Sequence, residues 1–195
     1  MLNQFGNKSI HAVSWQSQTT QYVRFDTLLQ NSIPNKTDEL TLLDLGCGLG
    51  DMYDYLLKNG YTNVVYTGYD IVPEMIAAAE ENYPAAEFEV KNFLEDNLPN
   101  MDIICASGSL NLVFDNAANQ IEYIKKAVTE MYKQSRVACA FNLLDKDNEW
   151  MYEKDPMFYY TDKQEIYKYC QTFCPNARLI SGYLPNDFTI ILPKR

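Results

Sequence analysis

Two patterns of hydrophobic and polar residues alternate along the chain. Short apolar runs rich in β-branched residues predict buried strands, and apolar residues spaced three to four apart predict amphipathic helices. We expect strands at residues 40–46, 63–70, 86–93, 101–107 and 136–144, followed by a hairpin over 177–194. We expect helices at residues 18–31, 51–60, 72–83, 116–134 and 162–174.

Strands that alternate with helices in this way form right-handed βαβ units around an open, mostly parallel sheet. The closing hairpin adds one antiparallel strand. The predicted fold class is therefore α/β, with a doubly wound sheet flanked by helices. Ligands of such sheets bind beyond the carboxyl ends of the strands, at the point where the strand order reverses.

Composition narrows the class of protein further. The 195 residues fit one domain, and the net charge of −10 disfavours nucleic acid as a partner. No apolar run approaches the roughly 18 residues of a membrane span, and we see no secretion signal. Five scattered cysteines fit a reducing, cytoplasmic compartment, and a single histidine without a Cys-x2-Cys pair argues against a metal site.

A glycine-rich segment, LLDLGCGLGDMYDYL, joins the first strand to the next helix. Gly46, Gly48 and Gly50 let the backbone adopt positive φ and let a ligand approach closely. The helix that follows offers free N–H groups at its start. Glycines at such a turn also occur for steric reasons alone, so the loop by itself does not define a ligand.

Acidic residues on both sides of the loop distinguish it from a phosphate cradle. A dinucleotide-binding loop has a third glycine where this chain has Asp51. A carboxylate about 4 Å from a pyrophosphate costs on the order of 1–4 kcal/mol, whereas it attracts an ammonium or sulfonium. Asp51 could instead only stabilise the helix N-terminus. Asp44 is part-buried in the strand, and we expect the loop N–H groups to satisfy it.

Two further polar residues stand at predicted strand ends. Asp70 follows the glycine loop by about twenty residues, where an acid accepts hydrogen bonds from both ribose hydroxyls. The alternative is an N-cap for the helix that begins at Pro73. Asn92 ends the third strand and could bond an adenine amino group, with Phe93 or Leu94 against the ring, although asparagine there is also a common turn residue.

This constellation resembles the class I S-adenosylmethionine-dependent methyltransferases, especially small bacterial members. The resemblance runs from the Asp44–Gly50 loop through Asp70 and Asn92 to the final DFTIIL. It implies a seven-stranded, Rossmann-like sheet of order 3-2-1-4-5-7-6 with strand 7 antiparallel. It also implies a single domain over 1–195, with an N-terminal helical lid at 1–35 and a cofactor-binding core at 36–195.

The resemblance assigns S-adenosylmethionine as cofactor and a set of residues around it. The methionine part would lie against the glycine loop, the ribose against Asp70, and the ammonium against backbone groups after the fourth strand. Trp15 would close over the cofactor and Arg24 would pair with its carboxylate, although Trp15 could instead be a core anchor and Arg24 a solvated charge on its helix. The full set is Trp15, Arg24, Asp44, Gly46, Cys47, Gly48, Asp51, Asp70, Ile71, Met75, Asn92, Phe93, Ala106 and Ser107.

Methyl transfer from a sulfonium is an in-line displacement with an activated leaving group. The protein mainly aligns the groups and excludes water, so no catalytic residue is assigned. The segment CASGSLNL lacks the Asn/Asp-Pro-Pro-aromatic motif typical of enzymes that methylate exocyclic amines of nucleic acids or glutamine. We therefore expect a small-molecule acceptor, lined by polar and aromatic residues at Ser109, Asn111, Asn142, Asp145, Tyr159 and Tyr160; the tyrosines could also form only a hydrophobic wall.

Two other classes of protein remain open at this point. One is a nicotinamide-dependent oxidoreductase on a related sheet, which Asp51 and the lack of a Tyr-x3-Lys pair disfavour. The other is a protein methyltransferase, or a non-catalytic S-adenosylmethionine-binding module, with the same cofactor site. Neither the acceptor, the atom methylated nor the oligomeric state is readable from these residues.

Overall fold

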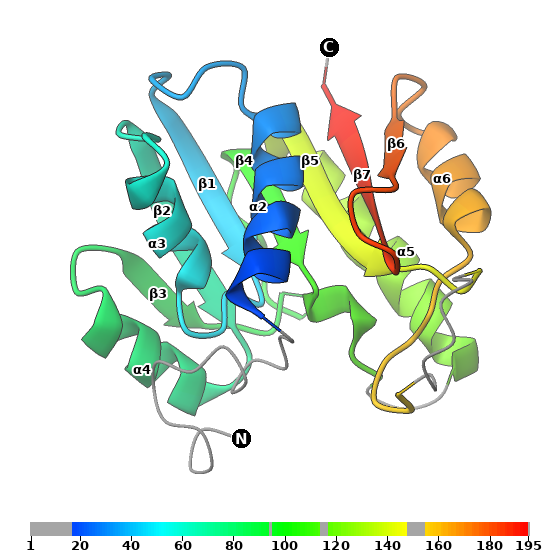
Figure 1. Cartoon of the computed structure of the whole chain (residues 1–195), viewed down its shortest axis with the longest axis horizontal. Coiled ribbons are helices and arrows are strands. Elements are labelled where there is room, and N and C mark those ends of the chain that lie inside the picture. Colours follow the sequence, from blue (N-terminus) through cyan, green and yellow to red (C-terminus); the bar gives the residue numbers. More distant parts are fainter. Residues whose placement is uncertain (1–16, 94, 114–116, 148–154, 195) are drawn as a thin grey trace.

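One seven-stranded sheet forms the centre of the protein in a computed structural model that describes residues 17–93, 95–113, 117–147 and 155–194 (Figure 1). The strand order is β3-β2-β1-β4-β5-β7-β6, and β7 is antiparallel to both neighbours, β5 and β6. Both features confirm the predicted fold. The strands are β1 Leu40–Leu45, β2 Val64–Asp70, β3 Glu87–Val90, β4 Met101–Ser107, β5 Ser135–Leu144, β6 Arg178–Ser181 and β7 Asp187–Pro193.

The strand order reverses between β1 and β4. β1 pairs in parallel with β2 on one side and with β4 on the other. The connections after β1 and β4 therefore leave toward opposite faces at the carboxyl edge of the sheet, the lower edge in Figure 1, which is where sheets of this kind bind ligands. The glycine loop lies at this edge, because it follows β1 directly.

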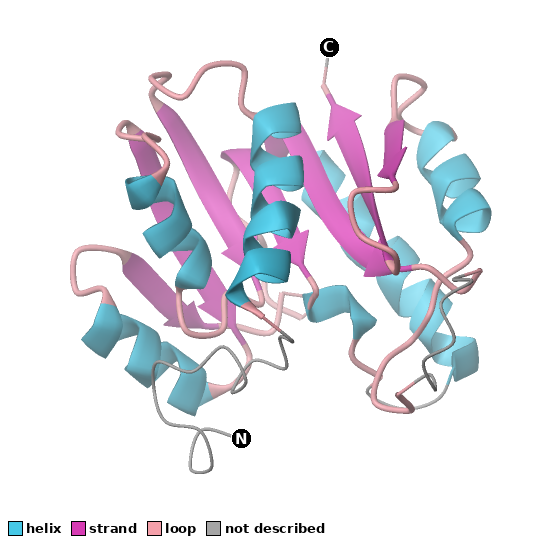
Figure 2. Ribbon diagram, viewed as in Figure 1, coloured by secondary structure: helices cyan, strands magenta, loops and turns pink. Residues whose placement is uncertain are grey.

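Helices cover both faces of the sheet (Figure 2). α2, α3 and α4 share one apolar cluster with the sheet, and α5 and α6 share the other. Successive residues of β1 alternate between the two, so that Leu42 faces the first cluster and Leu43 the second. The helices are α2 Gln18–Ser32, α3 Asp51–Lys58, α4 Pro73–Asn82, α5 Ala117–Gln134 and α6 Lys163–Gln171, with a short 3-10 helix, η2, at Ser109–Asn111.

The first described helix is a core element and does not behave as a lid. α2 packs against β4, β5 and β7, and Leu28 and Leu29 on its inner side are fully buried. This helical part of the expected lid at 1–35 therefore has a buried apolar stripe, which an opening motion would expose to water. Residues 1–16, which include Trp15, lie outside the described residues, and the lid stays a prediction. Among the described residues, no helix is long and apolar enough to span a membrane.

Replacing Leu29 tests this role of α2. Leu29→Ala removes a fully buried side chain, and we expect it to lower the free energy of unfolding by about 2–5 kcal/mol. The neighbouring exposed Gln30→Ala should change it by less than about 0.5 kcal/mol. Urea unfolding measures both variants, and an equally small effect for Leu29→Ala would show that α2 is loosely attached.

Candidate cofactor site at the carboxyl edge of the sheet

The glycine loop is a tight turn held against β2. Its three glycines have φ values of 76°, 55° and 82°, in the left-handed region that L side chains rarely adopt. The N–H groups of Gly46 and Cys47 donate to the carbonyl of Tyr69, at 2.7 and 3.0 Å. Gly50 then caps the start of α3. The loop backbone is therefore fixed before any ligand binds.

Ser109 closes the loop from the side of β4. Its Oγ donates to the carbonyl of Leu45 at 2.6 Å. A Cβ atom placed on Gly46 would lie only 2.2 Å from the Cβ of Ser109, so no other residue fits at Gly46 without displacing η2. Ser109, which the sequence assigned to the acceptor, thus joins the ends of β1 and β4.

Asp44 lies under the loop, and only 3% of it is exposed. The phenol of Tyr66 on β2 donates to its carboxylate at 2.9 Å. Burial, together with the charges of Asp70 and Asp51, raises the pKa of Asp44 to about 7, and the Tyr66 bond opposes this shift. The expectation that loop N–H groups satisfy Asp44 is wrong, because its side chain points to the α2–α3 face, where Tyr66 also lies.

The loop N–H goes to Asp70 instead. Gly48 N–H and Val72 N–H each donate to one of its carboxylate oxygens, at 2.9 Å. Burial raises the pKa of Asp70, and these backbone bonds oppose the shift. Asp70 therefore ties the glycine loop to the turn that begins α4, although the N-cap residue of α4 is Val72 and not Asp70. Ile71 beyond it is 52% exposed.

Asp51, the first residue of α3, receives a hydrogen bond that the sequence did not predict. Gln21 on α2 donates from Nε2 to its Oδ2 at 2.8 Å. Burial raises the pKa of Asp51 and the Gln21 bond lowers it. The sequence contains a signal for Gln21, because it lies on the buried side of α2 with Phe25 and Leu28. A polar side chain buried there needs a hydrogen-bond partner.

The residues assigned to adenine lie at the ends of β2 and β3. Asn92 forms a turn in which its carbonyl accepts from the N–H groups of Glu95 and Asp96, and its own N–H donates to the Asp96 carboxylate at 2.9 Å. Phe93 packs against Tyr123 with ring centroids 6.3 Å apart. Met75 packs on Leu49 and Ala78. Their contacts with the cofactor stay predictions.

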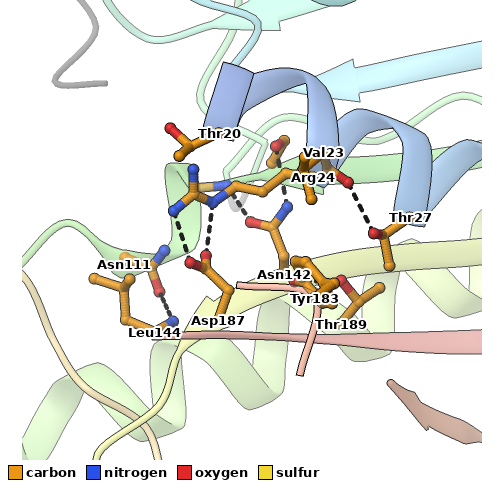
Figure 3. Close-up of polar contacts among 12 residues, drawn as sticks. Thr20, Val23, Arg24, Thr27, Asn111, Asn142, Leu144, Tyr183, Asp187 and Thr189 are labelled. Atoms are coloured by element: carbon orange, nitrogen blue, oxygen red, sulfur yellow. Dashed lines mark hydrogen bonds and ion pairs between the residues drawn. The ribbon is translucent and has the colours of Figure 1, made fainter. Parts of the chain in front are cut away.

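Hydrogen bonds join the ends of β4 and β5 into one polar surface. Asn142 donates from Nδ2 to Ser107 Oγ at 3.1 Å and accepts from Gly108 N–H at 2.9 Å (Figure 3). Asn111 accepts from Leu144 N–H at 2.9 Å through its Oδ1. Three residues predicted for cofactor or acceptor, Ser107, Asn111 and Asn142, therefore have structural bonds of their own.

Arg24 does not hold its guanidinium fork free for a carboxylate ligand. Its Nε and Nη2 donate to the two oxygens of Asp187, at 2.6 and 2.7 Å, in an ion pair that is largely buried (Figure 3). The prediction that this fork binds the cofactor carboxylate is corrected accordingly: Arg24 ties α2 to the start of β7. The pair with Asp187 uses the planar guanidinium geometry on which the predicted pairing of Arg24 with a carboxylate was based.

The remaining acceptor candidates lie on the segment that returns to α6. Tyr159 and Tyr160 are half-buried, and the N–H of Tyr159 donates to the Asn111 carbonyl at 2.7 Å. Tyr159 packs on the apolar cluster of the α5–α6 face, as the alternative of a hydrophobic wall requires. Asp145 is paired with Lys163 at 2.6 Å. Among the described residues, no group of three or more His, Cys, Asp or Glu side chains is arranged to hold a metal ion.

A family model described as a methyltransferase domain matches residues 36–173. The chain belongs to this methyltransferase family, whose members use S-adenosylmethionine as methyl donor. Rv1506c of Mycobacterium tuberculosis, provisionally named a methyltransferase, is 28% identical over 83% of this chain and 98% of its own length. The malonyl-[acyl-carrier protein] O-methyltransferase of a Paenibacillus species is 26% identical over 59% of this chain and 41% of its own.

Solved structures share the fold. An S-adenosylmethionine-dependent methyltransferase from Clostridium acetobutylicum superposes with a TM-score of 0.66 over 98% of both chains, at 13% identity. Magnesium protoporphyrin IX methyltransferase from Synechocystis, solved with S-adenosylmethionine bound, gives 0.64 over 91% of this chain and 79% of its own, at 14% identity. At these identities the likeness establishes the architecture alone.

Gly46→Ala tests the close approach of Ser109. We expect it to lower the free energy of unfolding by about 2–5 kcal/mol, since it combines positive φ with overlap of the new methyl group. Gly60→Ala is the matched control: its φ is 81°, and a methyl group added there would meet nothing within 4 Å, so it should lower stability by only about 1–2 kcal/mol. Equal losses in urea unfolding would exclude the Ser109 contact.

Asp44→Asn tests the buried carboxyl group. Its folded-state pKa of about 7 lies above the ordinary value of 3.8, so between these values the folded protein holds a proton that the unfolded chain releases. The stability from this proton is complete below pH 4 and is lost progressively as the pH rises to 7. Relative to the variant, the wild type should lose at most about 4 kcal/mol over this window.

Urea unfolding of both proteins at pH 5 and pH 8 measures the difference. Relative to the wild type, the variant should be more stable at pH 8 than it is at pH 5. The same gap at both pH values would show that Asp44 keeps an ordinary pKa.

Proposed function

We propose that this enzyme transfers a methyl group from S-adenosylmethionine to a small polar or aromatic molecule. One observation carries the proposal: the carboxylates of Asp44, which is buried, and of Asp51 and Asp70, which are half-buried, flank the glycine loop at the point where the strand order reverses. Burial raises the pKa of each, so the ionised forms gain from a cation placed nearby.

A cation-bearing nucleoside fits this charge pattern better than a dinucleotide. The bound cofactor brings an ammonium and a sulfonium beside an adenosine without phosphate, and its cationic sulfur supplies an activated methyl group. A pyrophosphate would instead meet the acids that flank the loop. The acidic pattern supports the methyltransferase over the nicotinamide-dependent oxidoreductase.

In the proposed arrangement the adenosine lies over the ends of β2 and β3. Asp70 accepts from the ribose hydroxyls, and the exposed Ile71 packs on the adenosine. Asn92 and Phe93 meet the adenine, and the methionine part follows the glycine loop toward β4. The 52% exposure of Ile71 supports this, because an adenosine on top of it would bury an apolar side chain that otherwise faces water.

The acceptor then lies over the ends of β4 and β5, in line with the methyl group and sulfur. The uncharged polar side chains at these strand ends are those of Ser107, Ser109, Asn111 and Asn142, of which only Ser109 is not buried. Hydrogen bonds hold these side chains in place, so they support the acceptor side of the site rigidly. We assign no general base.

Methyl transfer from labelled S-adenosylmethionine to a panel of small metabolites tests the proposal. We expect label in at least one small product, identified by mass spectrometry. A parallel arm with whole-cell protein separates the alternative: label recovered only in protein would replace the small-molecule acceptor by a protein acceptor. Binding of S-adenosylmethionine without methyl transfer in either arm would contradict the proposed activity and indicate a non-catalytic S-adenosylmethionine-binding module.

Asp70→Ala tests the ribose contact. Loss of hydrogen bonds from a charged acceptor to two hydroxyls should weaken S-adenosylhomocysteine binding by roughly 10- to 100-fold in calorimetry. Glu74→Ala is the control, an exposed acid on the first turn of α4 whose loss should change the affinity by less than about twofold. Since Asp70 also holds the loop, thermal unfolding confirms that the variant is folded; unchanged affinity would remove the ribose assignment.

A further inference from the structure

Gln21 carries an unpaired polar atom within the candidate cofactor site. Only 2% of the residue is exposed, and its Oε1 is buried with no hydrogen-bond partner among the described residues. Its Nε2 donates to Asp51 at 2.8 Å, which fixes the amide with its nitrogen toward the carboxylate and its oxygen turned away. A buried acceptor without a partner costs about 1–3 kcal/mol, so its retention calls for a donor that arrives later.

The position of Gln21 identifies the part of the site that it faces. Asp51 follows the glycine loop directly, and α2 packs over β4, β5 and β7 rather than over β2 and β3. The N-terminal ends of α2 and α3 lie together at the carboxyl edge, near the ends of β1 and β4 (Figure 1). Gln21 is therefore on the methionine side of the proposed cofactor and away from Asp70 and Ile71.

We propose that Gln21 is a cofactor-binding residue whose Oε1 accepts a hydrogen bond from the α-ammonium group of S-adenosylmethionine. This inference rests on the proposed function and goes beyond it, because it assigns a group on α2 to one end of the donor. Gln21 also holds Asp51 beside the same ammonium, so that one residue supplies an acceptor and positions a negative charge.

The chemistry of the two groups selects the ammonium. The cofactor carboxylate has only acceptor oxygens, which an amide oxygen and a carboxylate would repel. The ribose hydroxyls can donate, but Asp70 lies on their side of the site. The ammonium has three N–H donors and a positive charge, and it satisfies Oε1 and Asp51 together.

Calorimetric titration of Gln21→Met with two ligands tests the proposal. Methionine keeps the length of the side chain and removes both polar atoms. We expect binding of S-adenosylhomocysteine to weaken about tenfold, as the loss of one such bond implies. Binding of 5′-methylthioadenosine, which has no amino-acid part, should change by less than about twofold.

Gln30→Met is the matched control. Gln30 lies on the same helix, is exposed, and also donates to an acid, Asp26. It should leave both affinities unchanged. Equal weakening of both ligands by Gln21→Met would mean that Gln21 only supports the loop, and no weakening of either would mean that Oε1 has no ligand; each result overturns the proposal.

A ligand-side measurement needs no variant. The wild type should bind S-adenosylhomocysteine about tenfold more tightly than its deaminated analogue, and equal affinity would exclude a bond from the ammonium to Gln21 even if Gln21→Met failed to fold. The proposed function fails separately: there the wild type binds neither S-adenosylhomocysteine nor 5′-methylthioadenosine.

Discussion

Removal of carboxylates from water beside the glycine loop is the constraint on which the site depends. Asp44 sits under the loop, where the phenol of Tyr66 donates to it, and burial, together with the charges of Asp70 and Asp51, raises its pKa to about 7. An arrangement of this kind opposes folding, because the acids lose their hydration. It is compensated when a cation enters, so the same acids that strain the free protein select its ligand.

Hydrogen bonds and one ion pair hold the site rigidly and allow the protein to tolerate this charge. Ser109 locks the loop through Leu45, Asp70 holds Gly48, and the ends of β4 and β5 are joined through Asn142. The ion pair between Arg24 and Asp187 fastens α2 to β7 on the same face. The site is thereby built before the cofactor arrives, and binding energy can be used for alignment of the methyl group instead of for ordering the protein.

The sequence predicted the open, mostly parallel sheet because hydrophobic periodicity, glycine turns and strand–helix alternation are local signals that agreed with one another, whereas the strand order came from the resemblance to the methyltransferases. It also located the glycine loop and Asp70, since their spacing along the chain is itself informative. Side-chain pairs between residues far apart in the chain could not be predicted from the sequence. Tyr66 lies 22 residues from Asp44, and Asp187 lies 163 residues from Arg24, so only the folded sheet brings each pair together. The helical pattern of residues 18–31 could not tell a lid from a core helix, because both have one apolar face.

The decisive measurement is calorimetric titration of the wild type with S-adenosylmethionine and with NAD, each alone and each in the presence of the other. It compares a cation with a diphosphate at the same glycine loop. We expect micromolar affinity for S-adenosylmethionine and no measurable heat with NAD. Tight binding of NAD, displaced by no amount of S-adenosylmethionine, would contradict it and place a pyrophosphate where the carboxylates require a cation.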